Sequence, residues 1–308
     1  MIGKPGITLA TGLIISLLLV SCSDDNEKKN KESMTMSKDQ GVTSNKKTIQ
    51  INTMFEVAYY GQPQLIQRYL DHNHSINGVD NKSSSTPIFY AIQANQVDTI
   101  QPFLDNGATI EHKNTLGQTP LHMAASLGRI QIVSILLKNK ANINAVDNNG
   151  LTPLIYAIKN KREDVAKLLI EKGAILDGNN KFQITPLHLA IQHKNTKVFE
   201  YLLSSNRKIN INYQNIDGLT PLHYAVIGDN FKAVEALVKK GVKLDIQDKE
   251  GSTALHIAIV NKKIKIVKNL IANGANKEIK DKKGKNALDY AKVSWSQAIR
   301  KAVINEKK

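Results

Sequence analysis

Histidine is the residue type with the widest chemical reach in this chain, and four of its eight histidines occupy one position of a recurring motif. These four are His122, His188, His223 and His256. A position that recurs in this way favours a structural role, since an active site needs its histidine in one place only. His72 and His74 are two residues apart and could ligate a metal, but no third ligand is apparent beside them.

Other signatures of catalysis are missing from the sequence. The chain contains no nucleotide-binding glycine loop, no nucleophile elbow and no HExxH motif. Its carboxylates are scattered, and no pair is placed by its spacing at a convergent site. We therefore expect a protein that is not an enzyme, with no cofactor, no metal and no catalytic residue.

The single cysteine, Cys22, stands at the end of the only long apolar run, residues 7–20. This run is shorter than the roughly 20 residues that span a bilayer, and it suits a secretory signal peptide with Lys4 as its positive flank. The segment Leu19-Val20-Ser21-Cys22 resembles the lipobox of bacterial lipoproteins. That resemblance implies a signal peptide over 1–21 that is cut before Cys22, and a Cys22 that becomes acylated and anchors the chain in a membrane.

Residues 23–48 are polar and contain little to bury, so with Cys22 they predict a lipidated, flexible tether over 22–48. Ser23 follows the cysteine, where an inner-membrane retention signal would typically place aspartate. The resemblance therefore implies a bacterial envelope protein, at the outer membrane or cell surface rather than the inner membrane.

Charge is distributed unevenly along the remaining chain. Residues 49–178 hold 11 basic and 11 acidic residues, whereas residues 179–308 hold 24 basic and 11 acidic residues. Nearly all of the net charge of +15 therefore lies in the C-terminal half. Such a field favours an acidic protein or anionic lipid headgroups, and a soluble capping end rich in lysine is an equally good interpretation. Few aromatic residues accompany the lysines, so we expect no nucleic acid partner.

The elements that position these residues repeat along the chain. The motif Thr119-Pro120-Leu121-His122-Met123-Ala124 has six other copies, which begin at Thr86, Thr152, Thr185, Thr220, Thr253 and Asn286. Successive copies are 33, 33, 33, 35, 33 and 33 residues apart. Threonine caps a helix and proline suits the first helical turn, so each copy predicts the start of a helix. Apolar spacing after each copy predicts a second helix, and Gly107, Gly173, Gly241 and Gly274 stand where that helix ends in a left-handed turn.

This pattern resembles the ankyrin repeat, which has a period of about 33 residues and the signature T-P-L-H-x-A. The resemblance covers 49–308 and implies an all-α repeat solenoid of about eight helix–turn–helix units joined by β-hairpin loops. It also implies that the motif histidines tie the turn to the adjacent helix. The expected units lie near 49–79, 80–112, 113–145, 146–178, 179–213, 214–246, 247–279 and 280–308.

Several departures from the pattern carry expectations of their own. Lys140 replaces the helix-stop glycine, which should cost some stability. Pro102 falls inside a second helix and should kink or shorten it. Two extra residues near 204–208 lengthen one loop. At the C-terminus, Trp295, with Ile299 or Ala302, is expected to close the stack through apolar contacts.

Partners of ankyrin proteins usually dock on the hairpin tips and on the exposed side of the first helix, which implies a set of contact residues here. Apolar candidates along one edge are Leu116, Leu151, Phe182, Ile184, Ile216 and Leu219, with Phe182 the best anchor. Packing against the neighbouring hairpin is an equally good explanation for some of them. Polar candidates are Gln118, Asn149, Lys159, His193, Lys249, Lys282, Lys283 and Lys285.

The function expected from the sequence is therefore a non-catalytic, membrane-anchored scaffold, monomeric, that binds a protein partner. A basic C-terminal half would suit an acidic partner. Two alternatives stay open. The chain could be an immunity or inhibitor protein for an envelope enzyme or toxin, or an electrostatic binder of anionic surfaces through its basic half.

Overall fold

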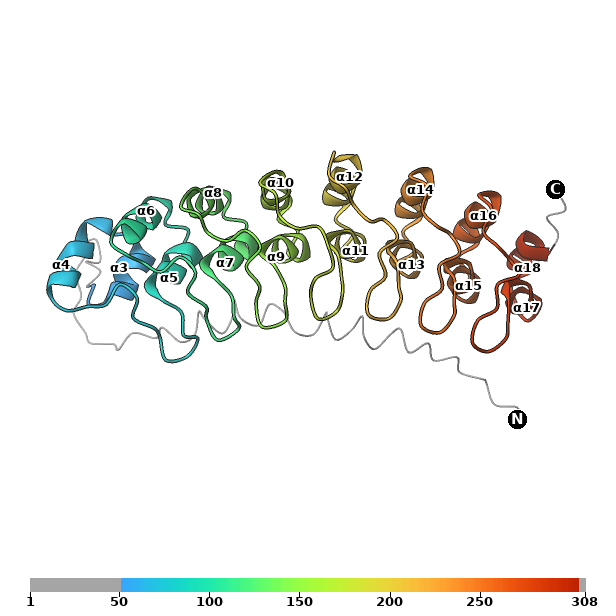
Figure 1. Ribbon diagram of the computed structural model, residues 1–308, viewed down its shortest axis with the longest axis horizontal. Coiled ribbons are helices and arrows are strands. Elements are labelled where there is room, and N and C mark those ends of the chain that lie inside the picture. Colours follow the sequence, from blue (N-terminus) through green and yellow to red (C-terminus); the bar gives the residue numbers. More distant parts are fainter. Residues whose placement is uncertain (1–50, 305–308) are drawn as a thin grey trace, which may run out of the picture. The chain divides into compact units, whose positions relative to one another are not determined.

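The computed structural model describes residues 51–304, and these form a stack of helix pairs (Figure 1). The helices make two rows, and we call the row next to the projecting loops the inner row and the other the outer row. The inner helices are α3 (Met54–Tyr60), α5 (Pro87–Gln93), α7 (Pro120–Leu127), α9 (Pro153–Lys159), α11 (Pro186–Gln192), α13 (Pro221–Ile227), α15 (Ala254–Val260) and α17 (Ala287–Lys292). The predicted signal peptide, Cys22 and the tether lie outside the described residues.

The outer helices alternate with the inner ones along the chain. They are α4 (Ile66–Asp71), which follows the 3-10 turn η1 (Pro63–Leu65), α6 (Val97–Asp105), α8 (Ile130–Lys138), α10 (Glu163–Glu171), α12 (Thr196–Ser204), α14 (Phe231–Lys239), α16 (Ile264–Ala272) and α18 (Gln297–Ile304). The loops that link one pair to the next project from the inner row as fingers (Figure 1). No strand occurs between residues 51 and 304.

Local sequence explains where the inner helices begin. In α11, the Oγ1 of Thr185 accepts a hydrogen bond from the backbone N–H of His188, while the backbone N–H of Thr185 donates to Nδ1 of His188. This reciprocal capping box recurs at Thr220, Thr253 and, with an Asn–Asp pair, at Asn286. The predicted helix starts are confirmed.

The outer helices α6, α10, α14 and α16 end in left-handed turns at the predicted glycines. Gly107, Gly173 and Gly274 have φ values of 87°, 96° and 90°. Lys140 takes φ 66° at the same position, where a side chain is disfavoured. Pro102 was expected to kink or shorten α6, and the helix is not shortened, since it keeps nine residues like α8 and α10. A proline removes only one N–H bond, and the buried Ile100 and Phe103 hold the helix in place.

The core is one continuous layer between the two rows. Motif residues such as Leu154, Ala157 and Ala190 are fully or nearly fully buried, and so are outer-helix residues such as Leu136 and Leu169. Each inner helix packs on the next inner helix and on its own outer helix. Because no single pair could bury both of its faces, stacking is what stabilises the units.

The C-terminal cap differs from the expectation. Ile299, Ala302 and Val303 of α18 are buried, and α18 packs against α16 and α17. Trp295 is 92 % exposed, so its predicted role in closing the stack was wrong. It lies in the turn before α18, outside the layer that the helix covers.

Candidate interaction surface

From the third unit onward, each finger turns around a buried or half-buried Asp or Asn side chain five residues before the helix cap. In the finger before α13, Oδ1 of Asn215 accepts hydrogen bonds from the N–H groups of Asp217 and Leu219 at 2.9 and 2.8 Å. Equivalent residues are Asn114, Asp147, Asn180, Asp248 and Asp281. This residue is not among the predicted site residues, although an Asp or Asn at one fixed position of every unit from the third onward was a usable signal.

Neighbouring fingers are joined by one backbone hydrogen bond at each step. The N–H of Asn148 donates to the carbonyl of Leu116, and the N–H of Ile216 donates to the carbonyl of Phe182, at 3.2 and 3.1 Å. The same bond links Lys249 to Asp217 and Lys282 to Glu250, at 2.9 and 3.0 Å. The fingertips therefore form a connected edge that holds its side chains in fixed order.

The predicted apolar residues separate into two groups on this edge. Leu116 is 54 % exposed, Ile216 is exposed, and Phe182 and Leu151 are half-buried. Ile184 and Leu219 are only 3 % and 4 % exposed, so the prediction that they contact a partner was wrong. Both stand directly before the helix cap, a position that the half-buried Leu151 occupies in its own finger.

The same position explains the motif histidines. Nε2–H of His188 donates to the carbonyl of Leu219 at 3.1 Å, and Nε2–H of His122 donates to the carbonyl of Leu151 at 3.0 Å. His223 bonds to the carbonyl of Ser252 in the same way. Because their Nδ1 atoms accept from the cap residue, these histidines are neutral and join each inner helix to the next finger. Burial lowers the pKa of His188 and of His223 to about 4.

The polar candidates differ in their exposure and in the hydrogen bonds that they already make within the stack. Gln118 is half-buried and donates from Nε2 to the hydroxyl of Tyr156 at 2.8 Å, so its amide is already bonded within the stack. Asn149 is exposed at its fingertip. Lys159 and His193 are half-buried at the ends of α9 and α11, and burial, followed by the charges of Lys159 and Lys161, lowers the pKa of His193.

The basic candidates lie on the last two fingers. Lys249, Lys282, Lys283 and Lys285 are all exposed. Ion pairs in the described part of the chain join Lys197 to Glu163, Lys263 to Asp229 and Lys292 to Asp289, and none involves these fingertip lysines. The nearby Asp281 carboxylate is occupied by two backbone N–H groups and the hydroxyl of Tyr290. The four lysine charges are therefore available to an external partner.

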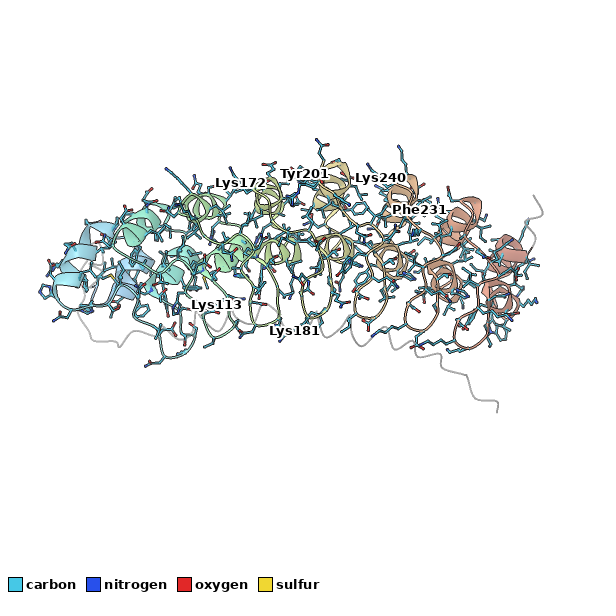
Figure 2. All side chains as sticks on the ribbon, viewed as in Figure 1. Lys113, Lys172, Lys181, Tyr201, Phe231 and Lys240 are labelled. Atoms are coloured by element: carbon cyan, nitrogen blue, oxygen red, sulfur yellow. The ribbon has the colours of Figure 1, made fainter. Side chains whose placement is uncertain are left out.

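The two sides of the stack are easily distinguished. Figure 2 shows Lys113 and Lys181 on the finger side, with Lys172 and Lys240 on the opposite side among the outer helices.

Among residues 51–304, no group of His, Cys, Asp and Glu is placed to hold a metal ion. Nδ1 of His72 bonds instead to the carbonyl of Arg68, and His74 packs edge-on against Tyr69. No helix in the same range is both long and apolar enough to cross a bilayer.

Comparison with known proteins identifies the repeat. A family model described as ankyrin repeats (3 copies) matches residues 53–147, 95–180, 141–215, 174–248, 207–283 and 242–306. No curated protein matches the chain.

Two solved structures share its fold. The ankyrin repeat domain of Bcl-3, titled a unique member of the IkappaB protein family, has a TM-score of 0.64 and 23 % identity, and the match covers 72 % of this chain and 99 % of that one. The human ASB11 ankyrin repeat domain has a TM-score of 0.62 and 24 % identity, with coverage of 73 % and 99 %. At these identities the likeness shows the fold alone.

Proposed function

The chain belongs to the ankyrin-repeat family, and from this we propose that it is a non-catalytic scaffold that binds a protein partner along its fingertip edge. Ankyrin repeats typically mediate protein–protein interaction. The observation that carries the proposal is the pair of exposed apolar side chains, Leu116 and Ile216, on fingers joined by backbone hydrogen bonds. Exposed apolar residues on a rigid edge lose little entropy on docking and gain from burial.

Phe182 lies between these two residues along the edge, and its half-buried ring offers an aromatic anchor. The exposed lysines of the last two fingers would speed association with an acidic partner and orient it. Within this proposal, affinity comes from the apolar edge and the rate of association comes from the basic end.

A matched capture experiment tests the apolar edge. Immobilised wild-type protein, the double variant Leu116→Ser with Ile216→Ser, and the control Ile175→Ser would be exposed to envelope extract at high salt. Ile175 is as exposed as Ile216 but lies in the loop after α10, away from the fingertips. We expect one protein to be retained by the wild type and the control and to be lost by the double variant. Equal retention by all three would reject the edge as the binding site.

We further propose that Cys22 is lipidated and anchors the scaffold to a bacterial envelope membrane. Its support is the position of the only cysteine directly after the apolar run 7–20 and Ser21. Cells supplied with an alkyne-tagged fatty acid should label the wild-type protein and should not label Cys22→Ser. Labelling that survives this substitution would contradict the anchor, without bearing on the partner surface.

A further inference from the structure

A second apolar feature lies at the C-terminal end of the inner row, apart from the fingertip edge. The seventh residue after the helix cap is Gln93, Ser126, Lys159 and Gln192 in four successive units and becomes Ile227, Val260 and Val293 in the last three. Ile227 and Val260 are half-buried, and Val293 is 68 % exposed. Since α13 packs on α15 and α15 packs on α17, these three residues occupy equivalent places on adjacent helices.

Trp295 continues this row at its exposed end. It stands two residues after Val293 and is almost fully exposed. An exposed tryptophan leaves a large apolar area in water, and tryptophan is enriched at the centres of binding sites. We call Ile227, Val260, Val293 and Trp295 the C-terminal row.

The same units carry the unpaired lysines. The basic fingertips, Lys249, Lys282, Lys283 and Lys285, precede α15 and α17, whereas the C-terminal row lies at the far ends of those helices. A seven-residue helix is about 10 Å long, and the fingers project beyond its start, so the row and the fingertip bases are separated by more than that length. Lys285 also lies 5.8 Å from the ring of Tyr290, on the inner helix between them. The surface is therefore apolar along one margin and basic along the other.

These dimensions favour one kind of occupant. Adjacent packed helices are about 8–10 Å apart, so the row extends about 20 Å across three units, the length of a helix of about 13 residues. A helix lying along the row would present apolar residues to it and would turn a second face toward the fingertips. Carboxylates on that second face would meet the lysines.

We propose that the inner face of the last three units binds an acidic amphipathic helix of a partner protein, with Trp295 as its anchor. The site shares the lysines of the last two fingertips with the fingertip edge, but its apolar row is separate from Leu116, Phe182 and Ile216. The Trp295 and Val293 variants therefore test it whether or not the edge binds a partner. An anionic lipid surface would also attract the lysines, but it offers no helix-length apolar strip to match a row of this length.

Trp295 is the only tryptophan of the chain, so its fluorescence reports directly on the site. The full-length protein would be titrated with a synthetic helix of about 14 residues that has leucine on one face and glutamate on the other. We expect saturable binding, a blue shift of the emission and protection from an ionic quencher. The same peptide with serine for leucine, or with lysine for glutamate, should produce none of these changes.

Substitutions test the apolar margin and the basic margin of the site independently. With a labelled peptide, Trp295→Ala should weaken binding at least about tenfold, and Val293→Ser should weaken it in the same direction. Lys282→Glu with Lys283→Glu should weaken binding and reduce its dependence on salt. The charge-matched control is Lys172→Glu with Lys240→Glu on the outer-helix side, and it should bind as the wild type does.

Three results would overturn the proposal. The first is an unchanged emission of Trp295 at saturating peptide. The second is an equal loss of binding in the Lys172→Glu, Lys240→Glu control, which would indicate a general field of positive charge. The third is a blue shift with phosphatidylglycerol vesicles and none with the peptide, which would assign the row to a membrane surface instead.

Discussion

At the scale of single residues, the buried histidines couple the stability of the stack to pH. His188 and His223 have pKa values of about 4 when folded, because burial disfavours their charged form, against an ordinary histidine pKa of 6.5. Between these values the unfolded chain binds protons that the folded chain excludes. Stability is therefore complete above pH 6.5 and falls as the pH drops toward 4.

We expect each of these two histidines to cost about 2 kcal/mol of stability between pH 7 and pH 5. Urea unfolding at both pH values would measure the loss. Replacement of both residues by glutamine should reduce it, since glutamine does not titrate and is accepted at the third helical position of a capping box. A double variant with the pH dependence of the wild type would contradict this assignment.

At the scale of single elements, the left-handed ends of the outer helices differ in cost. Lys140 holds φ 66° after α8, where other units place glycine. Lys140→Gly should therefore stabilise the protein by about 0.5–1 kcal/mol. The control is Lys172→Gly after α10, where φ is −78° and glycine offers no relief. In thermal or urea unfolding, the midpoint of Lys140→Gly should rise, whereas that of Lys172→Gly should fall or stay unchanged.

The longer loop after α12 is held by one side chain. Arg207 donates from Nη1 to the carbonyl of Ile170 at 2.8 Å and from Nη2 to the carbonyl of Ala174 at 3.1 Å, both in the preceding unit. These bonds tie the lengthened loop to the end of α10. Arg207→Ala should destabilise the protein by about 1 kcal/mol, and Lys208→Ala, at a side chain with no such bond, should leave stability unchanged. Equal effects of the two substitutions would remove Arg207 from this role.

At the scale of the whole molecule, the main helix contacts of residues 51–304 lie within one unit or between adjacent units. The inner helices α5 to α15 each pack on two other inner helices, whereas α3 and α17 each pack on one inner helix of the described part of the chain. Stability should therefore be highest in the middle and lowest at the ends.

Hydrogen exchange followed by mass spectrometry should show the slowest amide exchange in α9, α11 and α13. The end pairs α3–α4 and α17–α18 should exchange fastest. A protein that binds the C-terminal row should slow exchange in α17 more than in α3. Uniform protection along the stack would indicate global cooperativity and contradict nearest-neighbour stability.

The sequence by itself determined the number and order of the helices. Thr185, Pro186 and His188 specify a helix start through their own backbone bonds, and Gly173 and Gly274 specify a left-handed end. These signals act within a few residues, so they can be interpreted without knowledge of the rest of the chain. Repetition then made the stacked fold a necessary consequence, because each unit exposes an apolar face that only another unit can cover.

The exposure of the candidate contact residues was decided only by the tertiary structure. Leu116 and Ile216 point outward at the fingertips, while Leu219, a leucine of equal hydrophobicity, is covered. Trp295 is exposed although Ile299, four residues later, is buried. An apolar residue of one type can be buried or exposed, so residue type alone does not predict its exposure. The difference arises from the shape of the neighbouring unit, which no local pattern records.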